Sequence, residues 1–219
     1  LKKNGAAPLF NDSYLQPFFF DVNTFPKRLE LKIDGKLLRP GIDYLAQPES
    51  GSASGRFALT QKDSVTYLST TNKALTIRLE KKLMFSVAHE AVPWCAIQLL
   101  RNGPYTNTTM ATAEVRVKNR LQKNFANNNV GGFLHGQHTD DTLVIFTAHY
   151  DHLGGMGQVY FPGASDNASG TSMVLNLLRY YRAHPPKYKT LFILFAGEEA
   201  GLLGSKHFVE SAAVDLKKV

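Results

Sequence analysis

The sequence predicts an α/β fold, with a mostly parallel sheet, helices on both faces and a small β-rich insertion. Residues 142–148 and 190–196 are nearly continuous apolar runs, which are typical of strands buried on both faces. Residues 172–181 carry apolar side chains at a helical period. Residues 28–118 instead show short runs broken by turn signals, which favours short strands.

Residues 1–27 are aromatic and loop-like, and we assign them to the start of the main domain. Residues 28–118 are the predicted insertion. Within it, Asp34-Gly35 is a hairpin turn signal, and residues 92–100 fit either a strand or a short helix. The other expected elements are strands at 29–33, 74–79 and 112–117, and a Gly/Ser loop at 51–55.

Residues 119–219 form the predicted core of the main domain. After the strand at 142–148, the helix at 172–181 is ended by Pro185-Pro186. The strand at 190–196 is followed by a second helical stretch at 200–210. The order strand, helix, strand, helix implies a parallel sheet covered on both faces.

Composition argues against nucleic-acid and membrane-spanning functions. The 219 residues carry a net charge of +7, but the lysines and arginines are scattered and form no basic stripe with interleaved aromatics. The apolar runs are far shorter than the ~20 residues of a membrane helix. The single cysteine, Cys95, lies in an apolar stretch and is expected to be a buried structural thiol.

Polar, metal-capable residues follow both apolar strands. His149 and Asp151 come after the first strand, and Glu198 and Glu199 come after the second. Asp166 lies in a Gly-rich loop that enters the helix between them. In parallel α/β sheets, ligands bind just past the carboxyl ends of the strands, so we expect these side chains to meet in one cleft.

These residue types suit a zinc hydrolase. Zinc binds imidazole nitrogen and carboxylate oxygen, and a carboxylate can bridge two ions ~3.5–4 Å apart. Taken singly, His149 could be an ordinary histidine at a strand end, Asp166 a helix N-cap, and the glutamates solvated charges near a helix start. Three such groups at converging strand ends favour a metal site over these separate explanations.

Three motifs resemble family twenty-eight of the metallopeptidases, the di-zinc aminopeptidases whose relatives include glutamate carboxypeptidases. They are HYDHLG at 149–154, SDNASG at 165–170 and GEEAGLLGS at 197–205. Their order and spacing resemble those of the family over about residues 119–210. Residues 28–118 lie where many members carry a protease-associated domain, and this likeness is weaker.

The resemblance implies a role for each matching residue. His149 would bind one zinc ion, Glu199 the other, and Asp166 would bridge both. Glu198 would be the general base and later the acid, taking a proton from a metal-bound water. Asp151 would hydrogen-bond the other ring nitrogen of His149. The peptide after Asp166 is expected to be cis.

The family site has two further ligands, an Asp after the next strand and a His near the domain's end. The chain ends at Val219, so we expect a fragment with three of five ligands that is inactive by itself. The complete enzyme is expected to hold two zinc ions, to remove N-terminal residues from peptides, and to work outside the cytoplasm, although no signal peptide is visible.

Two other functions are considered. One is a metal-free or metal-poor binding protein on the same fold, which would have lost ligands that this chain keeps. The other is a glutaminyl cyclase, which shares the fold with one zinc, but the motifs at 165–170 and 197–205 resemble peptidases instead. The aminopeptidase remains the leading hypothesis.

Overall fold

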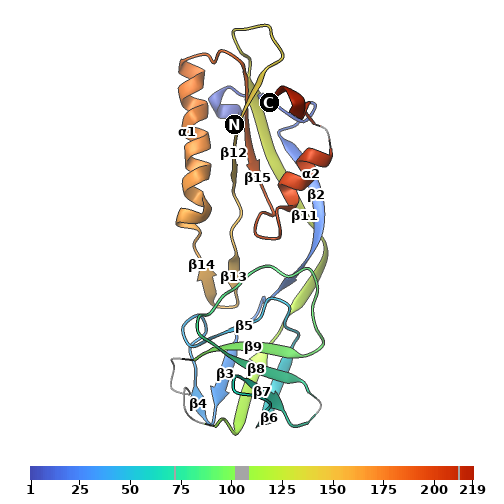
Figure 1. Ribbon diagram of the computed structural model, residues 1–219, viewed down its shortest axis with the longest axis vertical. Coiled ribbons are helices and arrows are strands. Elements are labelled where there is room, and N and C mark those ends of the chain that lie inside the picture. Colours follow the sequence, from blue (N-terminus) through green and yellow to red (C-terminus); the bar gives the residue numbers. More distant parts are fainter. Residues whose placement is uncertain (72, 102–108, 212) are drawn as a thin grey trace. The chain divides into compact units, whose positions relative to one another are not determined.

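The computed structural model describes residues 1–71, 73–101, 109–211 and 213–219 (Figure 1). These divide into two compact units, of which the first comprises residues 1–20, 126–152 and 162–219. The second comprises residues 21–125 and 153–161, so it takes in more of the chain than the predicted insertion at 28–118. Residues 72 and 102–108 of that insertion lie outside the described part.

The first unit is built on a five-stranded sheet. Its strand order is β1-β11-β15-β12, and β2 also pairs with β11. Two short helical turns, η1 (Lys2–Asn4) and η3 (Leu216–Lys218), lie near the ends of the chain, and a further turn spans Ala164–Ala168. The strands are β1 (Ala7–Pro8), β2 (Leu15–Thr24), β11 (Arg120–Leu134), β12 (Leu143–His149) and β15 (Lys189–Phe195).

This sheet is mixed, and the prediction of a mostly parallel sheet was wrong. β12 and β15 pair in parallel, as the helix that connects them requires. β15 pairs antiparallel with β11, which in turn pairs antiparallel with β1. β11 was not predicted because most of its residues are polar, glycine or solvent-exposed, so it lacks the apolar run of a buried strand.

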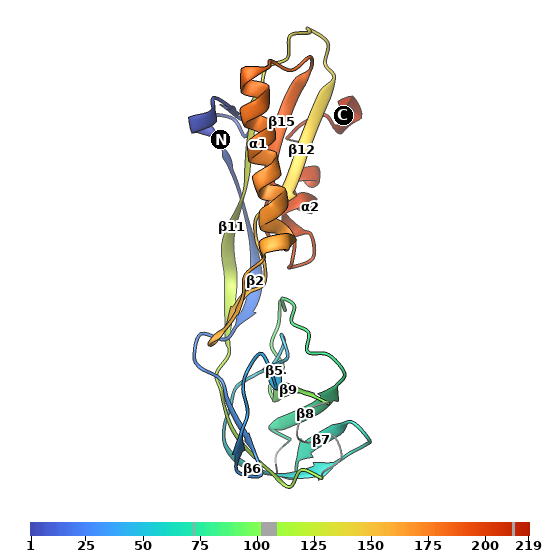
Figure 2. The same cartoon turned by 90° about the vertical axis from the view of Figure 1, so that its left-hand side faces the viewer.

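One helix packs on each face of the sheet (Figure 2). α1 (Ser169–Ala183) places Val174 and Leu178 against Phe192 and Leu194 of β15. α2 (Leu203–Glu210) places Phe208 against Leu191 and Ile193. α2 begins later than the predicted helix at 200–210, because Gly201 and Leu202 have positive φ angles that a helix does not allow. None of the helices in the described residues combines the length and apolarity needed to cross a bilayer.

The second unit contains an eight-stranded sheet with order β4-β3-β10-β6-β7-β8-β9-β5 and a separate hairpin of β13 and β14. Leu31, Ile33, Ile77 and Ile97 are fully buried in its core. The strands are β3 (Glu30–Ile33), β4 (Lys36–Leu37), β5 (Tyr44–Ala46), β6 (Ala53–Gln61), β7 (Thr66–Ser69), β8 (Leu75–Glu80), β9 (Cys95–Leu100), β10 (Thr112–Val117), β13 (Gly154–Met156) and β14 (Val159–Phe161).

Several local predictions for this unit are confirmed. Asp34 and Gly35 form the hairpin turn between β3 and β4, and both have positive φ angles. The ambiguous stretch at 92–100 contains a strand, β9. Cys95 is buried, and burial raises its thiol pKa to about 11, which keeps it unreactive at neutral pH. The loop predicted at 51–55 is wrong from Ala53 onward, where β6 begins.

Candidate metal centre

The carboxyl ends of β12 and β15 bring the predicted site residues to one edge of the sheet. The two strands run parallel, with His149 opposite Phe195 in the register. The N–H of Tyr150 donates to the carbonyl of Phe195, which continues the pairing by one residue. The segments that leave these two strands therefore start side by side, as expected at the ligand-binding edge of an α/β sheet.

His149 is fixed through both ring nitrogens. Nδ1 lies 3.1 Å from the carbonyl oxygen of Asp151, and Nε2 lies 3.0 Å from Oδ1 of Asp166. The backbone carbonyl of His149 accepts a hydrogen bond from Thr171 Oγ1 in the first turn of α1. If Nδ1 carries the proton that is donated to the carbonyl, Nε2 presents its lone pair toward Asp166, which is the orientation of a metal-binding histidine.

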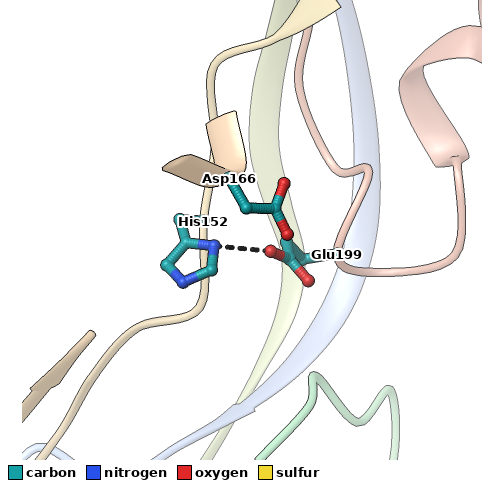
Figure 3. A group of neighbouring side chains, drawn as sticks. All are labelled: His152, Asp166 and Glu199. Carbon is teal, nitrogen blue, oxygen red and sulfur yellow. Dashed lines mark ion pairs between the residues drawn. The ribbon is translucent and has the colours of Figure 1, made fainter. Parts of the chain in front are cut away.

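A second histidine completes a cluster that sequence reasoning had not assigned. Figure 3 shows the side chains of His152, Asp166 and Glu199 converging. One potential ligand atom from each lies within 4.8 Å of the other two. Nδ1 of His152 is 2.6 Å from Oε1 of Glu199. The structure thus brings Asp166 together with His149 and with Glu199, as predicted, and adds His152.

The predicted role of Asp151 needs correction. Its carboxylate Oδ1 is 3.8 Å from Nδ1 of His149, beyond hydrogen-bond distance. Its carboxylate oxygens instead accept the backbone N–H groups of Glu198, at 3.2 Å, and Glu199, at 3.3 Å. Asp151 therefore holds the turn after β15, and only its backbone carbonyl reaches His149.

The two adjacent glutamates lie in different surroundings. The Glu199 side chain is 17% exposed and faces His152, whereas the Glu198 side chain is 37% exposed. Glu198 borders a cavity of about 320 Å³ that His149 and Asn167 also line. Glu199 is thus placed to bind an ion, and Glu198 is placed to meet a molecule in the cavity.

The loop that carries Asp166 has the expected backbone geometry. The peptide bond between Asp166 and Asn167 is cis, which confirms the expectation from the resemblance. Asn167 Oδ1 accepts the N–H of Gly170 at the start of α1. A Cβ atom at Gly170 would displace the Asn167 side chain that makes this hydrogen bond.

A buried asparagine outside the predicted site supports the turn that carries the glutamates. Asn129 is fully buried, and its Nδ2 donates to the carbonyl of Gly204 and to Oε1 of Gln16, both at 2.8 Å. Its Oδ1 accepts the N–H of Ala196 at 3.2 Å. Sequence reasoning missed Asn129, although an asparagine inside a strand is unusual and signals a specific partner.

The donor set fits zinc, which binds imidazole nitrogen and carboxylate oxygen. Nδ1 of His152 and Oε1 of Glu199 are both buried and form an ion pair at 2.6 Å, and neither makes a hydrogen bond. Buried polar atoms of folded proteins normally have a partner. Together with Asp166 they offer three donor atoms within 4.8 Å of one another, a group that could hold a metal ion.

Replacing Asp151 with alanine should lower zinc affinity by about 10- to 100-fold, because two N–H groups of the Glu198–Glu199 turn lose their acceptor. Zinc affinity can be measured by competition with a chromophoric chelator. Asp140→Ala is the matched control, since Asp140 also accepts a backbone N–H, that of Thr142, in an exposed loop. Equal affinities of the two variants would contradict the positioning role of Asp151.

The chain resembles known peptidases. Residues 129–219 match the family model described as "Peptidase family M28". Aminopeptidase YwaD of Bacillus subtilis (strain 168) is 44% identical over 68 residues, which are 31% of this chain and 14% of that protein. A probable zinc metalloprotease of Pyrenophora teres f. teres (strain 0-1) is 31% identical over 126 residues, which are 54% of this chain and 26% of that protein.

Two solved structures share the fold. A peptidase M28 precursor from Shewanella amazonensis SB2B superposes with a TM-score of 0.64 at 14% identity, over 99% of this chain and 61% of that chain. BSAP, a zinc aminopeptidase from Bacillus subtilis, superposes with a TM-score of 0.55 at 20% identity, over 97% of this chain and 58% of that chain. The chain thus spans less than two thirds of each relative.

Proposed function

We propose that this chain, whose residues 129–219 match the family model described as "Peptidase family M28", contributes to a zinc-dependent aminopeptidase that removes N-terminal residues from peptides. The observation that carries the proposal is the meeting of His149, Asp166 and Glu199 at one sheet edge, with Glu198 beside a cavity. The names of the similar proteins, an aminopeptidase and a zinc metalloprotease, support the same chemistry.

The proposed site would hold two zinc ions, and Asp166 would offer a carboxylate oxygen to each. His149 and Asp166 would hold one ion, and Asp166 and Glu199 would hold the other. A carboxylate has two oxygens and can serve both, and Asp166 already lies 3.0 Å from His149 Nε2 and within the cluster that contains Glu199. When bound, zinc would supply Lewis-acid polarisation of the scissile carbonyl.

The proposed general base is Glu198. Its carboxylate takes the proton from the attacking water and then passes it to the leaving amine. Two features support this role: the side chain is partly exposed at the cavity, and Asp151 fixes its backbone N–H. Glu199 differs because its Oε1 is buried against His152.

Two broader parts of the proposal rest on the family resemblance. We propose that the protein works outside the cytoplasm. We also propose that the β-rich second unit serves recognition, as a protease-associated domain would. The alternative of a metal-free binding protein is weakened because His149, Asp166 and Glu199 all remain in place, with Asp166 beside each of the other two.

Metal removal tests the proposed function. Dialysis of the complete enzyme against a chelator should abolish hydrolysis of leucine p-nitroanilide, and zinc, but not magnesium, should restore it, because the imidazole and carboxylate donors favour zinc. A peptide with an acetylated N-terminus should remain intact under the same conditions. Activity that survives complete metal removal would refute the proposal, and cleavage of the acetylated peptide would point to an endopeptidase.

A further inference from the structure

We propose that Gln158 is a positioning residue for the metal centre, because it anchors the hairpin that connects two metal-binding segments of the chain. This role rests on the proposed function and adds to it a residue that is not part of the metal site. The hairpin consists of β13 and β14 and spans residues 154–161. Residues 149–152 come before the hairpin, and the turn that contains Asp166 comes after it.

The chain leaves the first unit and returns to it within this short stretch. Residues 126–152 belong to the first unit, residues 153–161 belong to the second, and residues 162–219 belong to the first again. The two metal-binding segments are therefore covalent continuations of a hairpin that folds with the β-rich unit. Only one residue separates each end of the hairpin from His152 and Gly163, so a displacement of the hairpin would move both segments.

The hairpin also sets the distance between its own two ends. Gly154 and Phe161 are partners in its antiparallel register, and opposite residues of such a pair lie about 4.5–5.5 Å apart. Just beyond them, Gly163 packs on His152, and a Cβ atom at Gly163 would come within 2.8 Å of the His152 side chain. The carbonyl of Gly163 accepts a backbone N–H from the end of the turn that contains Asp166. The spacing at the base of the hairpin thus continues into the spacing between the metal-binding segments.

Gln158 anchors the tip of the hairpin through both ends of its side-chain amide. Oε1 accepts the N–H of Leu29 at 2.9 Å, and Nε2 donates to the carbonyl of Leu29 at 2.8 Å. Leu29 is 1% exposed and belongs to the core of the second unit. The side chain of Gln158 therefore makes the pair of backbone bonds that a neighbouring strand would make, and it holds the turn against a fixed part of the core.

The residues beside Gln158 pack against the same part of the core. The N–H of Gly157 donates to the carbonyl of Phe25 at 2.9 Å. Gly157 has a φ of +59°, which favours glycine, and a Cβ atom there would collide with the Leu29 side chain. Met156 is fully buried in the core of this unit. Three consecutive residues, 156–158, thus anchor the hairpin, and none of them belongs to the proposed catalytic machinery.

A purely structural role for Gln158 makes a different prediction. If Gln158 only stabilises the second unit, its loss should lower the free energy of unfolding and leave the bound ion unchanged. Gln98 supplies the matched control, because its amide makes the same two bonds to the backbone of Met84 in the same unit, at 3.1 Å and 2.7 Å. Gln98 lies in β9, which does not lead directly into a metal-binding segment. Only the loss of Gln158 should therefore reach the metal centre.

The decisive experiment compares Gln158→Ala with Gln98→Ala in the complete enzyme, loaded with zinc or cobalt(II) well below the melting temperature of either variant. We expect Gln158→Ala to weaken zinc binding by about 2- to 30-fold, the range of coupling through packed elements, and to change the visible absorption spectrum of bound cobalt. Gln98→Ala should lower the melting temperature of the metal-free enzyme and keep wild-type metal binding. Equal metal binding by the two variants would overturn the inference and leave the proposed function standing. A wild-type enzyme that binds no zinc would overturn both.

Gly157→Ala gives an independent arm. Its Cβ atom would push the tip of the hairpin away from Leu29 without removing the Gln158 side chain, so it should reproduce the loss of zinc affinity and the change in the cobalt spectrum. Gly35→Ala is the control for backbone strain, because Gly35 also has a positive φ but has open space where its Cβ would lie. Wild-type metal binding in Gly157→Ala would show that the position of the hairpin tip does not control the metal centre.

Discussion

In the complete enzyme, replacing Glu198 with glutamine should abolish nearly all peptide hydrolysis while metal binding persists. The amide cannot accept a proton from the attacking water, and loss of a general base typically costs about 10²–10⁴-fold in rate. The Glu198 side chain borders the cavity and is not part of the His152, Asp166 and Glu199 cluster. Its loss should therefore leave the metal ligands in place.

The neighbouring residue supplies the control for this experiment. Glu199→Gln changes the same kind of side chain one position along the chain, but it should weaken zinc binding because Glu199 Oε1 lies within the cluster. The kcat for an aminoacyl p-nitroanilide and the bound zinc, measured by mass spectrometry, should separate the two variants. Wild-type kcat in Glu198→Gln would remove Glu198 from the mechanism.

Replacing Asn129 with alanine should lower the free energy of unfolding by about 2–4 kcal/mol. The change removes the partners of Gly204 O, Gln16 Oε1 and the Ala196 N–H. A buried group left without its partner costs about 1–3 kcal/mol. The loss should also loosen the turn with Glu198 and Glu199, because Ala196 and Gly204 lie on either side of it.

Asn127→Ala is the matched control, since Asn127 lies in the same strand, is only half-buried and makes none of these bonds. Urea denaturation of both variants, followed by circular dichroism, gives the comparison. Equal stabilities would show that the buried network contributes little and that another feature holds the turn.

The elements nearest the site could be predicted because their sequences carry strong periodicity. β12 and β15 are continuous apolar runs, and α1 has a clear helical period, so their type and order were confirmed. β11 was not predicted, because this antiparallel strand carries many exposed polar residues and so has no continuous apolar run in its sequence. The mixed sheet follows from that one strand, which separates β1 from β15.

The site was predictable in its residues but not in all its contacts. His149, Asp166 and Glu199 could be named from strand ends and motif spacing, and the structure brings them together. The partners of Asp151 and His152 depend on how two loops fold over each other, which no periodicity encodes. The carboxylate of Asp151 therefore bonds the Glu198–Glu199 turn, and His152 joins the cluster.

The most direct test of the proposed metal site is a crystal structure of the zinc-loaded protein, with data collected on both sides of the zinc absorption edge. We expect two anomalous peaks at about 2.0–2.2 Å from the carboxylate oxygens of Asp166. His149 should contact one ion, and Glu199 the other. Zinc peaks that lie away from Asp166, or crystals in which Asp166 binds no metal, would contradict the proposal.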